Sequence, residues 1–111
     1  MAETDQGWIR EGSQPDGTRF RIARDQWEKH RAKRPEIADG LSLVAWAMKQ
    51  PKTAEPDRHR PDEERRGFRL FTVAGRGKWR GYILRVSVKY VQQPSGEWIK
   101  FYQSCWYERA R

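Results

Sequence analysis

The chain has one cysteine, Cys105, only two histidines and no long apolar run. A single cysteine cannot form an intramolecular disulfide, and a metal site would need that thiol, the histidines and scattered carboxylates, so we predict neither. The apolar runs are far shorter than the roughly 20 residues that span a bilayer, and the first residues do not have the pattern of a signal peptide. We therefore expect a cytoplasmic protein with no membrane contact and no cofactor.

The sequence also lacks the compact motifs of common enzymes. It contains no nucleophile elbow, no paired-cysteine motif, no HExxH and no glycine-rich dinucleotide fingerprint. Any catalytic site would therefore consist of residues dispersed along the chain. His30 and His59 are the only side chains whose ordinary pKa suits proton transfer near neutral pH, although a histidine on a helix face is more often a surface residue than a catalyst.

Charged and aromatic residues are abundant. The 111 residues carry a net charge of +8, 34% of them are charged and the mean hydropathy is −1.09, a composition that leans towards disorder. Six Trp, four Tyr and four Phe nevertheless supply enough apolar surface for one folded core. We expect a mobile N-terminal lead-in, residues 1–17, followed by a single domain, residues 18–111.

Local patterns predict one strand and two helices in the first half of this domain. Residues 18–23 alternate between apolar and basic side chains, which is typical of a half-buried strand. Asp25 suits a helix N-cap, and that helix should end near Arg34 because Pro35 follows. A second helix, from Pro35 to just before Pro51, would turn one apolar stripe towards the core. The stripe comprises Ile37, Leu41, Val44 and Met48.

The second half of the chain predicts a sheet. Residues 52–66 are too polar and too rich in proline for a regular element, with room only for an edge strand at 53–57. Strands follow at 67–74, 82–91 and 97–108, with hairpin-like connections. We therefore expect an α+β fold in which an N-terminal strand and two helices pack on an antiparallel sheet of three to four strands.

The positive charge is concentrated at the C-terminal end. From residue 67 onwards, nine basic residues stand against two acidic ones, and alternation assigns the strand residues to two faces. Leu84, Val86 and Val88 would form the core face. The opposite face would carry Arg85, Ser87, Lys89, Lys100, Tyr102, Ser104, Trp106 and, in an ambiguous register, Arg69. Such a face could bind the phosphates and bases of RNA or DNA; the alternative is an ordinary solvated sheet face.

A second basic feature is the segment GRGKWRG at residues 75–81. It combines Arg76, Lys78, Trp79 and Arg80 between glycines. Cations beside an indole suit contact with a phosphate backbone and stacking on a base. A plain exposed hairpin tip is the alternative.

The basic face also suggests a metal-free ribonuclease site. Because the 2′-hydroxyl of RNA is the nucleophile, such an enzyme needs only proton-transfer groups and cations for the phosphate in the transition state. Arg85, Lys89 and Lys100 could supply the charge, and Tyr102 or His30 could transfer protons.

Four segments carry a resemblance to a known group of proteins: FRIARDQWEKHRAKRPE, GFRLFTVAG, YILRVSVKYV and EWIKFYQSCWYERAR. In pattern and order they resemble small ribonuclease-like toxin domains of the barnase, EndoU, colicin and RelE superfamily, especially the phage-associated group. The resemblance implies counterparts of the family's site residues within 27–36, at Gln50 and Pro51, at Arg85 and within 102–104, including Ser104. Lys29 and Arg34 stand where that group often has histidine.

Three functions are therefore open. The first is a metal-independent endoribonuclease of toxin type, neutralised by an antidote protein. The second is a non-catalytic module that binds RNA or DNA. The third is a phage-type inhibitor that binds a partner protein, because a fold shared with an enzyme does not establish its activity.

Overall fold

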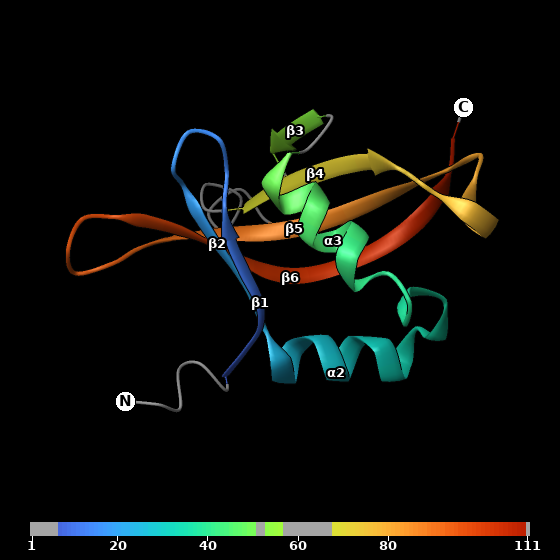
Figure 1. The fold of residues 1–111 in the computed structure, drawn as a ribbon, viewed down its shortest axis with the longest axis horizontal. Helices are drawn as coiled ribbons and strands as arrows, with labels where there is room; N and C mark the ends of the chain where they lie inside the picture. Colours follow the sequence, from blue (N-terminus) through green and yellow to red (C-terminus); the bar gives the residue numbers. More distant parts are fainter. Residues whose placement is uncertain (1–6, 51–52, 57–67, 111) are drawn as a thin grey trace.

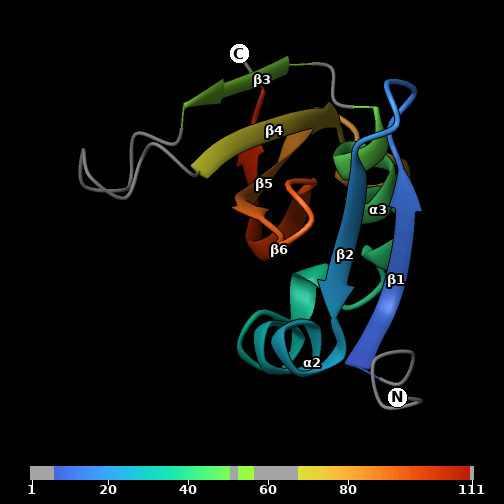
Figure 2. The same cartoon turned by 90° about the vertical axis from the view of Figure 1, so that its left-hand side faces the viewer.

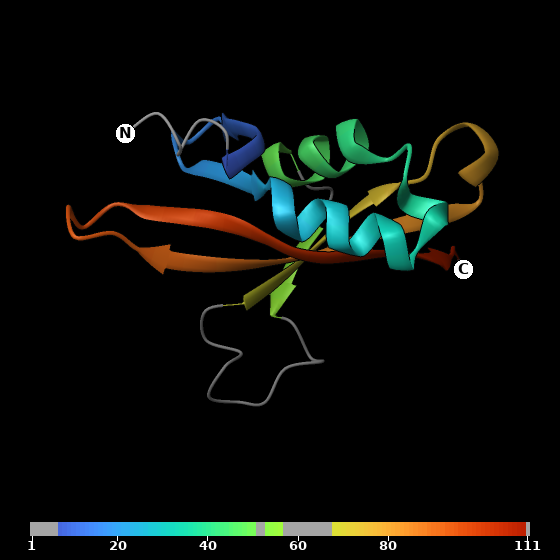
Figure 3. The same cartoon turned by 90° about the horizontal axis from the view of Figure 1, so that it is seen from below.

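A mixed six-stranded sheet with two α-helices on one side forms the protein (Figure 1). The computed structural model describes residues 7–50, 53–56 and 68–110. The strands are β1 (Trp8–Ser13), β2 (Arg19–Ala23), β3 (Thr53–Pro56), β4 (Phe68–Ala74), β5 (Tyr82–Gln92) and β6 (Trp98–Arg109). The helices are α2 (Arg24–Lys33) and α3 (Leu41–Lys49), with 3₁₀ turns η1 (Pro35–Ile37) and η2 (Gly77–Trp79). Both α-helices cover the same side of the sheet (Figure 3).

The strand order is β1-β2-β6-β5-β4-β3, and every pair is antiparallel except β2 with β6. The α+β class is confirmed, but the prediction of three to four antiparallel strands understates the sheet. The N-terminal strand is a member of that sheet, and the edge strand β3 lies where it was expected. Parallel pairing arises because the two helices carry the chain from β2 to the far edge of the sheet before the β4-β5-β6 meander returns.

Residues 8–13 are not a lead-in, because they form the edge strand β1. Figure 2 shows β1 running beside β2, with α2 following at the end of β2. Gly12 lies opposite Phe20 in this pair, and an added Cβ at Gly12 would lie 2.8 Å from Cζ of Phe20. Gly12 therefore makes room for a core ring. Residues 1–6 lie outside the described part of the chain.

Both α-helices end shortly before a proline, as predicted, but the residues at which they begin differ from the prediction. α2 begins directly after β2 with Ala23 at its N-cap and no side-chain cap, so the N-cap assigned to Asp25 was wrong; Asp25 lies in the first turn instead. The second helix is divided into η1 and α3 at Gly40, where an added Cβ would lie 3.1 Å from the Ile37 carbonyl oxygen. The apolar stripe survives this break, since Ile37, Val44 and Met48 are fully buried.

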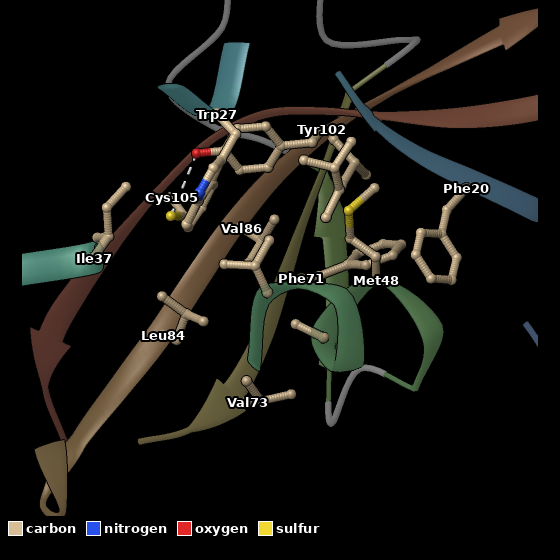
Figure 4. Packing of buried hydrophobic residues seen from close by; sticks show 14 residues of the cluster. Phe20, Trp27, Ile37, Met48, Phe71, Val73, Leu84, Val86, Tyr102 and Cys105 are labelled. Atoms are coloured by element: carbon tan, nitrogen blue, oxygen red, sulfur yellow. Dashed lines mark hydrogen bonds between the residues drawn. The ribbon is translucent and has the colours of Figure 1, made fainter. Parts of the chain in front are cut away.

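The core lies between the helices and the sheet (Figure 4). Leu84, Val86 and Val88 point into it from β5, as predicted. Cys105 is also buried there as a free thiol, and burial raises its pKa to about 11, so it fills space as a small apolar side chain. Trp27 of α2 packs edge-on against another core ring, with 5.8 Å between its centroid and that of Tyr102.

A β-bulge at Gln103 reverses part of the predicted face assignment. Ser87 pairs with Ser104, whereas the next β5 residue, Val88, pairs with Tyr102, so Gln103 is the extra residue in β6. Its carbonyl accepts a hydrogen bond of 2.7 Å from Gln26 Nε2 of α2. Because directly paired residues share a face, Tyr102 lies on the helix side with Val88.

Three residues assigned to the outer face therefore belong to the helix side. Lys100 pairs with Tyr90 and with the core residue Phe20, Tyr102 pairs with Val88, and Arg69 also pairs with Val88. Strict alternation was wrong for Lys100 and Tyr102 because the bulge comes between them and Ser104. Ser104 and Trp106, beyond the bulge, lie on the outer face with Arg85, Ser87 and Lys89, as predicted.

Lys100 is a fully buried cation. It has 0% relative exposure, its Nζ donates to the Met48 carbonyl oxygen of α3 at 2.6 Å, and Nζ lies 4.5 Å from the Phe71 ring centroid. Burial lowers its pKa from 10.5 to about 7, because a low-dielectric environment disfavours the charged form.

This amine makes stability depend on pH. Above pH 7 the folded protein loses the Lys100 proton while the unfolded chain keeps it up to its ordinary pKa, so the free energy of unfolding should rise by roughly 1 kcal/mol per pH unit. Urea denaturation at pH 6 and pH 9 should show a smaller rise in Lys100→Met than in the parent. Lys89→Met, at an exposed lysine of β5, should keep the parental rise. An equal rise in all three proteins would contradict the assignment.

Candidate nucleic-acid interface

The predicted catalytic arginine is held by carboxylates. Arg85 Nε lies 2.9 Å from Glu108 Oε2, and its Nη1 lies 3.3 Å from both Glu55 Oε1 and Thr72 Oγ1. Glu55 belongs to β3 and Glu108 to β6, so the guanidinium is compensated from both sides. A cation with two carboxylates beside it has little net charge to offer a phosphate.

The outer face as a whole carries paired charges. Arg19 Nε lies 2.8 Å from Glu97 and Arg21 Nε lies 3.5 Å from Glu11. The outer face is not purely basic, because Glu11 on β1 and Glu55 on β3 add carboxylates from edge strands distant in sequence. Of the other predicted residues, Lys89 lies 5.6 Å from the Phe68 ring centroid, Trp106 Nε1 donates to Glu108 at 2.8 Å, and Ser104 lies opposite Ser87.

His30 and Tyr102 meet on the other side of the sheet. His30 Nδ1 lies 2.9 Å from Tyr102 Oη, which donates to Cys105 Sγ at 3.4 Å (Figure 4 shows the latter bond). His30, Tyr102 and Cys105 therefore form one connected hydrogen-bonded chain on the helix side of the sheet. Burial, followed by Arg34 and the nearby lysines, lowers the pKa of His30, while burial raises the pKa of Tyr102.

The predicted catalytic set is thus divided by the sheet. His30, Tyr102 and the phosphate-binding candidate Lys100 lie on the helix side, whereas Arg85, Lys89 and Ser104 lie on the outer face. His59, the other histidine, lies outside the described residues. Within the described ranges, no three His, Cys, Asp or Glu side chains gather to hold a metal ion, and no helix is long and apolar enough to cross a membrane.

A cleft of about 440 Å³ opens where the start of α3 faces the β4–β5 hairpin. This volume lies in the range of roughly 300–1,000 Å³ that is usual for ligand pockets. Its walls combine aromatic side chains with charges of both signs. The lining residues are Glu36, Asp39, Gly40, Ser42, Leu43, Trp46, Arg76, Lys78, Trp79 and Tyr107.

Stacked aromatic rings form one wall of this cleft. Trp79 lies parallel to Tyr107 of β6, with 4.1 Å between centroids and 5° between planes, and meets Tyr82 edge-on. Across the cleft, Trp46 of α3 is 41% exposed, which is unusual for so large an apolar side chain, and the Arg76 guanidinium lies 5.9 Å from its ring centroid.

The hairpin 75–81 forms a tight turn at the cleft. Gly77 and Gly81 have φ values of +59° and +89°, and an added Cβ at Gly75 would lie 2.3 Å from the Trp79 carbonyl oxygen, so the glycines permit this tight turn. The structure brings together three of the four residues predicted here, Arg76, Lys78 and Trp79. Arg80 is exposed next to them and does not line the cleft.

Local patterns did not predict the opposite wall, although Glu36 lies within the range 27–36 that the resemblance implies. Glu36 and Asp39 precede α3 and Trp46 lies within it, whereas Tyr107, which stacks with Trp79, is 61 residues further along the chain than Trp46. Trp46 lies off the apolar stripe of α3, and this was the available signal, since an indole on the solvent side of a helix has no core to fill.

Comparisons with protein-family models, curated proteins and solved structures found no match. The resemblance to ribonuclease toxins therefore stays a prediction.

Proposed function

We propose that the protein is a non-catalytic module that binds single-stranded nucleic acid, RNA in particular, in the cleft between α3 and the β4–β5 hairpin. The observation that carries this proposal is the exposed Trp46 in an aromatic-walled cleft that it shares with the basic hairpin. Aromatic side chains stack on bases and contribute about 1–3 kcal/mol per base, while neighbouring cations bind phosphates.

Cations in two neighbouring hollows supply a path for the backbone. Arg76 and Lys78 line the cleft, and a second hollow of about 250 Å³, which Trp46 also lines, includes Arg10 and Lys49 together with Glu11. A strand that crosses Trp46 would place a base on the indole with phosphates near the cations of each hollow. Such alternation of stacking platform and positive charge is characteristic of single-strand binding.

The endoribonuclease and inhibitor hypotheses have less support. Cleavage would need proton-transfer groups and cations at one phosphate, whereas His30 and Tyr102 lie on the opposite side of the sheet from Arg85. The mixed charge and exposed indole of the cleft would also suit a partner protein, so the binding assay has to distinguish both alternatives.

We expect Trp46→Ala to weaken binding of a single-stranded RNA by roughly 5- to 100-fold, the equivalent of one lost base stack. The matched control is Trp98→Ala, which removes another exposed indole, 51% accessible, at the β5–β6 hairpin, and should change affinity less than 3-fold. The measurement is fluorescence anisotropy with EDTA present. Equal losses in both variants, or no binding by the parent at low salt, would contradict the proposal; RNA fragments in EDTA would favour the endoribonuclease.

The salt dependence of binding identifies the cations that meet phosphates. Lys78→Ala should reduce the slope of log affinity against log salt by about 1, because one phosphate contact is lost. Arg85→Ala should leave the slope unchanged, since that guanidinium is already paired with Glu55 and Glu108. The titration is the same assay repeated over a salt series. A reduced slope for Arg85→Ala and a parental slope for Lys78→Ala would return the binding site to the outer face.

A further inference from the structure

Two carboxylates line the cleft opposite the basic hairpin. Glu36 lies in η1 and Asp39 in the turn before α3, and both side chains are exposed. In the part of the chain that the structure describes, neither forms an ion pair, although Arg76 and Lys78 line the same cleft. Glu55 and Glu108, by contrast, each form an ion pair with Arg85.

One wall carries cations and the other carries carboxylates, so the cleft suits a ligand with an anionic group on one side and a hydrogen-bonding edge on the other. A simple anion would be attracted by Arg76 and Lys78 but repelled by the carboxylates. A simple cation would be attracted by the carboxylates but repelled by Arg76 and Lys78. A nucleotide stacked on Trp46 carries its phosphate on one side and its base edge on the other. With the phosphate at the hairpin, the base edge would lie in the part of the cleft that Glu36 and Asp39 line.

Ionised carboxylates only accept hydrogen bonds, so they discriminate among base edges. Cytosine presents an N4 amino group as a donor, and carboxylates accept from it, whereas uracil presents the O4 acceptor at the same place. An acceptor facing a carboxylate loses its water without gaining a partner, which weakens binding. The two pyrimidines have the same ring size, so stacking on Trp46 does not distinguish them.

We propose that Glu36 and Asp39 are specificity-determining residues that make the cleft prefer bases with an exocyclic amino group, cytosine over uracil. The proposal rests on the proposed function, because it assumes a base stacked in the cleft. It adds that sequence preference comes from the acidic wall, while general affinity comes from Trp46 and the hairpin cations.

The experiment compares octacytidylate with octauridylate, which have equal length and charge. The parent should bind the cytidine oligomer at least 5-fold more tightly, the lower end of what one good base contact contributes. The double variant Glu36→Gln, Asp39→Asn should lose that preference and bind octauridylate more tightly than the parent, because two negative charges near the RNA are gone. The matched control, Asp25→Asn with Glu28→Gln on the exposed side of α2, should keep the parental preference.

The outcomes separate the two proposals. Equal binding of both oligomers by the parent, with both weakened by Trp46→Ala, would overturn the acidic-wall proposal and leave the proposed function in place. Retention of the preference in the Glu36 and Asp39 double variant would also overturn it. Failure of the parent to bind either oligomer at low salt would overturn both proposals.

Discussion

The bulge at Gln103 is the constraint on which the arrangement of the two sheet faces depends. One extra residue in β6 puts Lys100 and Tyr102 under the helices while Ser104 and Trp106 stay outside. The backbone carbonyl of Gln103 accepts a hydrogen bond from the Gln26 side chain of α2. This bond connects the helix to the strand at the bulge. The inward residues then connect the layers, with Lys100 bonded to α3 and Tyr102 bonded to His30 of α2. Without the bulge, a cation and a phenol would be on the outer face.

Net charge and available charge are different quantities in this protein. The formal charge is +8, yet Arg19, Arg21 and Arg85 on the outer face each have a carboxylate partner. Exposed pairs of this kind contribute little to stability, but they remove positive potential from the sheet. The hairpin cations Arg76 and Lys78 have no such partner among the described residues. Glu36 and Asp39 line the same cleft, so the cleft differs from the outer face not in net charge but in having cations without a carboxylate partner among the described residues.

Local patterns predicted those features that depend on local causes. Pro35 ended α2 near the expected residue, the stripe through Ile37, Val44 and Met48 faced the core, and the three C-terminal strands lie where alternation indicated. The failures have non-local causes. β1 is recognisable only once the Phe20 ring lies over Gly12, the bulge depends on a contact between Gln26 and Gln103, and the cleft combines Trp46 with Tyr107. The partners in these contacts are not identified by neighbouring residues; the off-stripe position of Trp46 indicated only that its indole was exposed.

The location of the binding surface is the central claim, and the six tryptophan indole N–H groups report on it directly. Their resonances in a ¹H–¹⁵N spectrum, assigned by single substitutions, can be followed as single-stranded RNA is added. We expect the signals of Trp46 and Trp79 to shift first, while the signal of Trp106, whose Nε1 is bonded to Glu108 on the outer face, stays in place. Shifts of Trp106 with unchanged Trp46 and Trp79 would contradict the central claim.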